Sequence, residues 1–340
     1  MFMERLKVPG RAGSLLLQLA LGAAIVALLV WYAGAKNLGL ALASADPLRL
    51  ALALLAYLAM NLIFAYRMKL VLEGLGRNVS FAGALAAQYG GMLASDFTPA
   101  RSGYLVVPAI LRARGIPVEA GLSTILGCQT VEFVVKMAGG TAAVLYLLSK
   151  VSLSRELLAL SALGLALMLL GGLAIALAMW SRRVLRLLRG LGGKPLIGGL
   201  ASALAGRASS FQAEAEKVKP ALPAITALTL ASWLVKGLEW YFIGSALSVE
   251  GLGFLAFFLL HPLVTALSFV PLTPSGLGFQ EGAAVGLLRL LGAPIEAALA
   301  FALLARLLLV LEDAAGIPAL MKAGARGLGE ALGWRGPPPK

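Results

Sequence analysis

The stretch Asp96-Phe97-Thr98-Pro99-Ala100-Arg101-Ser102-Gly103 interrupts a long apolar region with a proline, an acid, an arginine, two hydroxyls and a glycine. Proline removes a backbone N–H donor and pushes the residue before it out of helical geometry. A second interruption, Pro271-Leu272-Thr273-Pro274-Ser275-Gly276-Leu277-Gly278, follows farther along the chain. We therefore expect two broken helices whose breaks face each other and form a site.

The composition around these breaks is that of a membrane protein. Hydrophobic residues make up 60% of the 340 residues and charged residues only 13%, whereas a soluble domain carries about 25% charged residues. The mean hydropathy is +0.89. Because lipid offers no hydrogen bonds to the backbone, such a chain must pair its polar groups within helices. We predict an all-α, polytopic membrane protein.

The net charge of +13 has two explanations, nucleic-acid binding and membrane orientation. The basic residues cluster in loops beside apolar runs, which is the positive-inside pattern and also suits anionic head groups. We therefore expect membrane lipids, and no nucleic acid, as partners. Cys128 and His261 are the only cysteine and histidine, so we expect no metal, no cofactor and no catalytic residue, and we expect that the protein is not an enzyme.

Six apolar runs are long enough to cross a bilayer. They are residues 14–35, 48–72, 118–148, 157–180, 220–247 and 294–321. Two pairs of arms flank the breaks, 81–97 with 102–111 and 254–272 with 277–291. The arm 102–111 is too short for about 30 Å of hydrocarbon at about 1.5 Å per residue. We predict six spans and two re-entrant hairpins, the first hairpin entering from the cytoplasm and the second from outside.

Basic clusters at the ends of the runs orient the chain in the cytoplasmic (cell) membrane. Arg5, Lys7 and Arg11 precede the first run, and the densest cluster, residues 182–194, follows the fourth. These clusters place both termini in the cytoplasm, with a cytoplasmic linker over 182–219 and a tail over 322–340. Residues 33–35 also resemble a signal-peptidase site, but the run before them is long enough to span.

The two breaks belong to a larger internal repeat. Glu73-Gly74-Leu75-Gly76 recurs as Glu250-Gly251-Leu252-Gly253, an offset of 177 residues, and Gly115, Pro117 and Glu119 recur at the same offset as Gly292, Pro294 and Glu296. We predict one membrane domain over 1–321, with repeat one at 48–149 and repeat two at 220–321. The extra span 157–180 gives the repeats opposite topologies, the arrangement of many transporters.

The breaks have the chemistry of an anion site. The arm after each break would begin a helix deep in the membrane, and its free N–H groups carry about half a positive charge. Hydroxyls and Arg101 would add donors for a phosphate or another anionic head group. The alternative is a bent helix pair in which Arg101 reaches toward the membrane surface. The predicted substrate-binding residues are Asp96, Thr98, Pro99, Arg101, Ser102, Gly103, Thr273, Pro274, Ser275, Gly276, Gly278 and Glu281.

Other charged residues lie within the spans. Glu132 and Lys136 are four residues apart, and Lys236 and Glu239 are three apart, so each pair shares a helix face. The pairs are either structural ion pairs or part of a hydrophilic path for a head group or a proton. Arg306 has no local partner, and we expect Asp313 or Glu281 to reach it. The predicted path residues are Glu132, Lys136, Lys236, Glu239, Arg306 and Asp313, and we expect His261 to be packed or pore-lining.

At these motifs the chain resembles the flippase-like transmembrane domain at the N-terminus of bacterial lysylphosphatidylglycerol synthases. The matching residues are Thr98 to Gly103, Pro271 to Glu281, and Arg306, and the resemblance covers roughly residues 14–321. Tyr104 stands where the family has an acid after the glycine, and Phe133 and Lys136 depart from the family's run after Glu132. The family's soluble aminoacyl-transfer domain has no counterpart here, so we expect no lipid aminoacylation by this chain.

Three functions fit these features. The first, which the resemblance favours, is a lipid translocase (flippase) for an anionic or aminoacylated phospholipid or a polyprenyl-phosphate carrier. The second is an intramembrane enzyme that modifies a lipid head group with Asp96 or Glu281 as base. The third is a non-transporting membrane partner of a glycosyltransferase. A glycosyltransferase or a lipid synthase is accordingly the expected protein partner.

Overall fold

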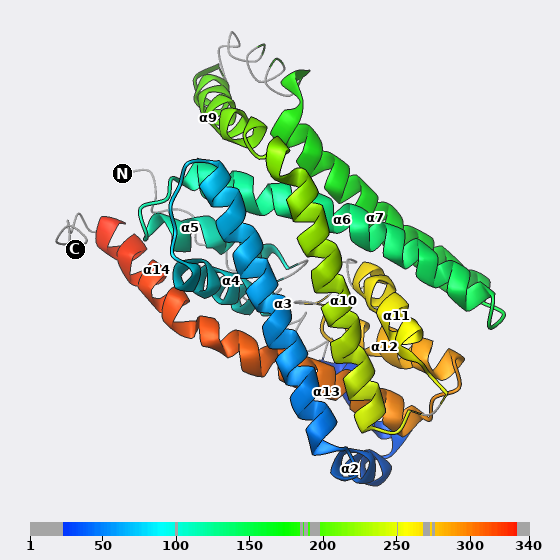
Figure 1. Ribbon diagram of the computed structural model, residues 1–340. Helices are drawn as coiled ribbons and strands as arrows, with labels where there is room; N and C mark the ends of the chain where they lie inside the picture. The colour runs from blue at the N-terminus through cyan, green and yellow to red at the C-terminus, as the bar shows by residue number, and fades with distance from the viewer. Residues whose placement is uncertain are drawn as a thin grey trace.

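The computed structural model describes residues 23–98, 101–183, 186, 190, 198–249, 251–267, 273 and 276–331, and the side chains of all of these except 198–204 and 325–331 (Figure 1). Every regular element in this part of the chain is helical. The prediction of an all-α protein is therefore confirmed for the described residues.

Four helices are long and apolar enough to cross a membrane. They are α3 (Pro47–Gly74), α6 (Val118–Leu148), α7 (Arg155–Trp180), and a continuous run, Ala205–Ala246. This run joins α9 (Gly198–Glu216) through η2 (Lys219–Ala221) to α10 (Leu222–Ala246). Helix Ala23–Ala33 and α2 (Ala35–Ala43) make a fifth candidate, bent by 87° at Gly34, whose φ is 79°. The chain is a multi-pass membrane protein with four or five candidate spans, whereas six were expected.

Local sequence signals set where these helices begin. The Asp46 carboxylate caps α3 by accepting a hydrogen bond from the Leu48 N–H at 2.9 Å, with Pro47 at the first helical position. Ser154 caps α7 in the same way at 3.2 Å. Serine and aspartate at the cap, and proline just inside it, satisfy or remove the N–H groups that a helix start leaves unpaired. The predicted limits of these spans are therefore close to the observed ones.

Both predicted interruptions are present as helix breaks. The first separates α4 (Phe81–Asp96) from η1 (Ser102–Val106) and α5 (Val107–Arg112), and both of these pack back against α4. The second separates α11 (Phe254–Leu267) from α12 (Phe279–Leu290), and these two helices also pack together. In Figure 1, α4 and α5 lie on one side of the central pair α3 and α10, and α11 and α12 lie on the other side.

The last predicted span, 294–321, is not a single helix. It consists of α13 (Ile295–Asp313), the 3₁₀ turn η3 (Ala314–Gly316) and α14 (Ile317–Ala331). Pro318 explains the interruption, because its missing N–H cannot bond the carbonyl four residues earlier. α13 also carries four ionisable residues among its 19 and is not among the candidate spans.

The long helices form the frame that holds the short arms. α3 and α10 pack side by side through the middle of the molecule, and α6 packs against α7 and α11 (Figure 1). Glycines allow the closest approaches. A Cβ on Gly139 of α6 would lie 2.9 Å from Pro262 of α11, and one on Gly316 of η3 would lie 2.3 Å from the Tyr89 carbonyl oxygen of α4.

Two turns far apart in the sequence have the same hydrogen bonds. Each follows a short arm and precedes a long helix, and each has a glycine with positive φ, 83° at Gly115 and 94° at Gly292. In the first turn, the Gly115 N–H donates to the Arg112 carbonyl and the Ile116 N–H donates to the Leu111 carbonyl. In the second turn, the Gly292 N–H donates to the Arg289 carbonyl and the Ala293 N–H donates to the Leu288 carbonyl. These residues correspond at the offset of 177 residues that relates Gly115 to Gly292.

Gly316→Ala is expected to destabilise the protein by about 1–3 kcal/mol, because the added methyl has to displace the α4 backbone. Gly286→Ala is the matched control, since Gly286 is exposed on α12 and has open space around its Cβ position. Thermal unfolding in detergent, followed by size-exclusion chromatography, measures both. Equal melting temperatures for the two variants would contradict the packing of η3 against α4.

Candidate functional site

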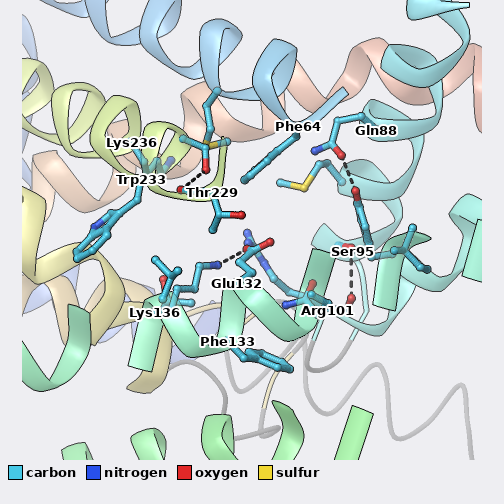
Figure 2. A pocket seen from close by; sticks show the side chains of 18 of the residues that line it. Phe64, Gln88, Ser95, Arg101, Glu132, Phe133, Lys136, Thr229, Trp233 and Lys236 are labelled. Carbon is cyan, nitrogen blue, oxygen red and sulfur yellow. Dashed lines mark hydrogen bonds and ion pairs between the residues drawn. The ribbon is translucent and has the colours of Figure 1, made fainter. Parts of the chain in front are cut away.

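A cavity of about 390 Å³ lies between the long helices and the first break. Its walls come mainly from α3, α4, η1, α6, α10 and α11, with single residues from α7, α12 and α13, and Figure 2 shows many of the side chains that line it. This is the size range of small-ligand pockets. The cavity is thus large enough for a small ligand, and its lining combines charged and polar groups with a larger apolar surface.

Five charged side chains belong to the polar part of the lining. Four cations line the cavity, Arg67 of α3, Arg101 at the first break, Lys136 of α6 and Lys236 of α10. Glu132 is the single carboxylate among the described lining residues. Figure 2 shows Glu132 and Lys136 on α6, with Thr229 and Lys236 on α10 across the cavity from them. Charges within a membrane protein are costly and mark sites for ions or polar substrates.

Glu132 forms ion pairs with two of the four cations. Its carboxylate lies 2.6 Å from the Lys136 ammonium and 3.4 Å from the Arg67 guanidinium. Arg67 also donates a hydrogen bond to the Thr229 hydroxyl at 2.7 Å and lies over the Phe64 ring at 4.5 Å. Because Arg67 is 4% exposed, its charge depends on these partners. The predicted contact between Glu132 and Lys136 is confirmed.

Lys236 and Glu239 form the second predicted ion pair, with 2.5 Å between ammonium and carboxylate. The Glu239 side chain is fully buried, and Lys236 also lies 4.6 Å from the centre of the Tyr57 ring. The lysine faces the cavity, whereas the glutamate is not among its lining residues. The pair therefore presents its positive end to the cavity.

At the first break, Arg101 lines the cavity and adopts a left-handed backbone conformation with φ of 55°. Its nearest carboxylate is that of Asp96, 3.9 Å away. Thr98 does not point its hydroxyl at the cavity. That hydroxyl donates to the Ala94 carbonyl at 3.1 Å and accepts from the Gly103 N–H at 2.6 Å. Of the predicted residues in this break, Arg101 alone lines the cavity among those described.

The remaining residues of the first break shape the turn. A Cβ at Gly103 would lie 2.2 Å from the Ala94 carbonyl oxygen, so glycine is required there. Ser102 is exposed. Pro99 lies outside the described residues.

The second break does not offer the free helix end that the sequence predicted. The Gly278 N–H at the start of α12 donates to the Glu281 carboxylate at 2.6 Å, and the Thr273 hydroxyl donates to the Leu277 carbonyl at 2.8 Å. A carboxylate from the same helix thus takes the place expected for the head group, as in a capping box. Gly276 and Gly278 supply positive φ angles of 68° and 81° for the turn.

Residues after the second break connect it to α13. The Arg306 guanidinium lies 2.6 Å from the Glu281 carboxylate and 3.2 Å from the Gln280 amide oxygen. The sequence predicted Asp313 or Glu281 as the partner of Arg306. The partner in the structure is Glu281. Gln280, in the first turn of α12, lines the cavity, whereas no described residue of the second break itself does. Pro274 and Ser275 lie outside the described residues.

A chain of hydrogen bonds runs beside the cavity from η1 to α13. The Tyr104 hydroxyl donates to Gln88, the Gln88 amide donates to Asn61 at 3.2 Å, and the Asn61 amide donates to the Tyr57 carbonyl at 3.4 Å. The Tyr57 hydroxyl donates to the Asp313 carboxylate at 2.9 Å. This chain links four helices through buried polar groups, which fixes the wall of the cavity.

Several lining residues were not predicted from the sequence. Arg67 lies near the end of the run 48–72 and is followed by Lys69 and Arg77, a pattern typical of the membrane surface, although its side chain is buried and lines the cavity. Gln88, Gln129 and Ser232 are polar residues inside apolar runs, which is the signal that would have found them. His261 lines the cavity and meets the Trp240 ring edge-on at 5.0 Å, so the expectation of a packed or pore-lining histidine is met.

The fold and this cavity define a multi-pass membrane protein whose helical bundle contains a pocket with a largely apolar surface and four cations against one carboxylate. The family model described as the lysylphosphatidylglycerol synthase TM region matches residues 16–311, and the chain belongs to this family. The family indicates a membrane protein of lipid modification or translocation. Comparison with curated proteins gives no match. Among the described residues, no group of three or more His, Cys, Asp or Glu side chains is placed to hold a metal ion.

Proposed function

We propose that this protein is a lipid translocase that carries the anionic head group of a membrane lipid through the cavity while the acyl chains stay in the bilayer. The observation that carries the proposal is the lining by Arg67, Arg101, Lys136 and Lys236. Counting their buried carboxylate partners Glu132, Asp96 and Glu239 leaves one positive charge in excess. A phosphate would balance it with charge-assisted hydrogen bonds.

The substrate class follows from the same charges. The lining offers donors and cations, and its single carboxylate, Glu132, is already paired with Lys136 and Arg67. An anionic phospholipid or a polyprenyl phosphate fits this lining directly. An aminoacylated phospholipid brings a cationic amine, for which the described lining holds no unpaired carboxylate. We therefore rank the anionic lipids first and keep the aminoacylated lipid as a test case.

We infer that the domain is built from two inverted repeats with re-entrant hairpins, the arrangement expected from the sequence. The order of elements supports this, because α3, α4, α5 and α6 in repeat one correspond to α10, α11, α12 and α13 in repeat two. The matching hydrogen bonds of the two turns at Gly115 and Gly292 support it further. In such transporters the substrate site lies where the repeats meet, and here α3 packs against α10 beside the cavity.

The protein is proposed to lie in the cytoplasmic membrane with α9 on the cytoplasmic side. Arg77 of the loop after α3 pairs with Glu214 of α9 at 3.6 Å, so this loop and α9 lie at the same end of the bundle. Arg182 and Arg183, which follow α7, and Lys217 and Lys219, which follow α9, belong to the basic segments near that end. The positive-inside rule puts such an end in the cytoplasm.

Leaflet exchange in liposomes tests this function. Purified protein is reconstituted with head-group-labelled phosphatidylglycerol, lysyl-phosphatidylglycerol or a zwitterionic phosphatidylcholine, and a membrane-impermeant quencher reports the outer leaflet. We expect the protein to accelerate exchange of phosphatidylglycerol, with little effect on phosphatidylcholine. Mass spectrometry of the recovered lipids should show no chemical change.

Two outcomes would favour the other functions. A modified head group would indicate an intramembrane enzyme. Exchange at the rate of protein-free liposomes for every lipid, including a polyprenyl phosphate, would contradict the translocase and favour a non-transporting partner of a glycosyltransferase or a lipid synthase.

A further inference from the structure

Two buried carboxyl groups meet at the side of the cavity. Asp96 is the last residue of α4 and Asp313 the last residue of α13. The Asp96 side chain is 3% exposed and Asp313 is fully buried. α4 packs against α13, and the two carboxyl groups interact with each other electrostatically. Helices that are distant in the sequence thus bring two acids next to each other in the interior of the helical bundle.

A hydrogen-bond donor is missing from this pair. The Tyr57 hydroxyl donates to both Asp313 oxygens, at 2.9 and 3.1 Å. Neither oxygen of Asp96 receives a hydrogen bond from any described residue, although both oxygens are buried. Buried acceptors without a donor are rare in folded proteins. A proton held between the two carboxyl groups would supply the missing donor.

Electrostatics favours the same arrangement. Two ionised carboxylates in contact repel each other, and such pairs hold one shared proton. Burial adds to the cost of the doubly charged state, because the interior screens the repulsion poorly. One proton on the pair removes the repulsion between the two carboxylates and also gives Asp96 the hydrogen bond that it lacks.

The pair is connected to the cavity through Arg101. The Arg101 guanidinium is 3.9 Å from the nearer Asp96 oxygen and lines the cavity. When the pair binds a proton, it loses a negative charge, and the attraction that holds Arg101 to Asp96 weakens. The guanidinium then becomes available to an anion in the cavity.

We propose that Asp96 and Asp313 form a proton-binding site, and that the proton and the anionic head group promote each other's binding. This inference rests on the proposed function, because it needs a head group bound at Arg101. Reciprocity between two bound ligands is a thermodynamic requirement, so the head group must also increase proton binding. The protein would then carry a proton together with the lipid.

The charged and titratable groups around the pair come from every helix packed against it. They are Tyr57 on α3, Tyr89 on α4, Arg101 after the first break, Lys236 and Glu239 on α10, and Arg306 and Glu312 on α13. Glu312 bonds the Tyr89 hydroxyl at 3.4 Å and is not among the cavity-lining residues. His261 lines the cavity on the α11 side.

The pH dependence of phosphatidylglycerol exchange tests the proposal between about pH 5.5 and about pH 8.5. This phosphodiester stays ionised across the range, so the lipid itself does not titrate. Wild-type exchange is expected to fall as pH rises, by up to about tenfold per pH unit for one proton. Asp96→Asn, which keeps a donor next to Asp313, is expected to exchange at a rate that does not depend on pH.

Glu312→Gln is the matched control, because it makes the same acid-to-amide change one residue from Asp313. Its phosphatidylglycerol exchange rate is expected to change with pH as the wild-type rate does. The proposal would be overturned if the pH dependence of exchange were lost in Glu312→Gln or in His261→Gln but kept in Asp96→Asn. A dependence on sodium at fixed pH that Asp96→Asn abolishes would also overturn it, since the site would then hold a metal cation.

Calorimetry gives a second readout that does not depend on transport. A short-chain phosphatidylglycerol is titrated into the detergent-solubilised protein in two buffers of different ionisation enthalpy. Wild type is expected to take up a fraction of one proton per bound lipid, and Asp96→Asn none. Binding and exchange without proton uptake would refute the proton site and leave the proposed function standing, whereas absence of both binding and exchange at every pH would refute both.

Discussion

Arg101→Ala is expected to slow phosphatidylglycerol exchange by about 10- to 100-fold, the effect of losing a charged hydrogen bond of about 1.5–3 kcal/mol. Arg101 is the cavity cation whose carboxylate partner is farthest away, 3.9 Å from Asp96. The other three cations form closer ion pairs, Arg67 and Lys136 with Glu132, and Lys236 with Glu239. The guanidinium of Arg101 is therefore the group with the most binding capacity left for a phosphate. Leaflet exchange in liposomes measures the effect.

Two companion variants sharpen this prediction. Arg101→Lys keeps the charge but loses the planar fork that binds phosphate with two hydrogen bonds, so its rate should fall between those of wild type and Arg101→Ala. Arg207→Ala makes the same change at an exposed position on α9 and should leave the rate unchanged. Equal rates for wild type and Arg101→Ala, at equal protein incorporation, would exclude Arg101 from head-group binding.

Glu132→Ala is expected to destabilise the protein by about 3–5 kcal/mol, because it leaves the buried Arg67 and the partly buried Lys136 without their counter-charge. Arg67 and Lys136 both depend on this carboxylate, and Arg67 is 4% exposed. The midpoint of thermal unfolding in detergent, together with the monodisperse yield after size-exclusion chromatography, reports the loss.

The control is a pair at the surface. Glu73 pairs with Lys69 but is 47% exposed, so Glu73→Ala should cost at most about 1 kcal/mol.

Adding Arg67→Met to Glu132→Gln removes the orphaned cation and should restore part of the lost stability. If the double variant is no more stable than Glu132→Gln alone, the ion pair between Arg67 and Glu132 does not carry the stability assigned to it.

The apolar runs made most of the fold predictable. The runs 48–72, 118–148, 157–180 and 220–247 predicted α3, α6, α7 and α10 to within a few residues. Proline also predicted both breaks. The 3₁₀ turn Ala314–Gly316 was missed because Pro318 stands one residue into the next helix, inside a run that is apolar enough to be taken as a single span.

The site was predictable only in part, because a sequence does not show which way a side chain faces. Ion pairs at three or four residues, such as Glu132 with Lys136, follow from helix geometry alone. Contacts between distant helices, such as Arg67 with Thr229 or Asp96 with Asp313, depend on tertiary packing. The second break was expected to expose its N–H groups, but Glu281 of the same helix takes the one at Gly278.

The measurement that tests the central claim most directly is a high-resolution structure of the protein in nanodiscs that contain phosphatidylglycerol. The account predicts a phosphate inside the cavity, within hydrogen-bonding distance of the Arg101 guanidinium, with the acyl chains outside the polar lining. A cavity filled by an acyl chain, with every phosphate at the membrane surface, would contradict it.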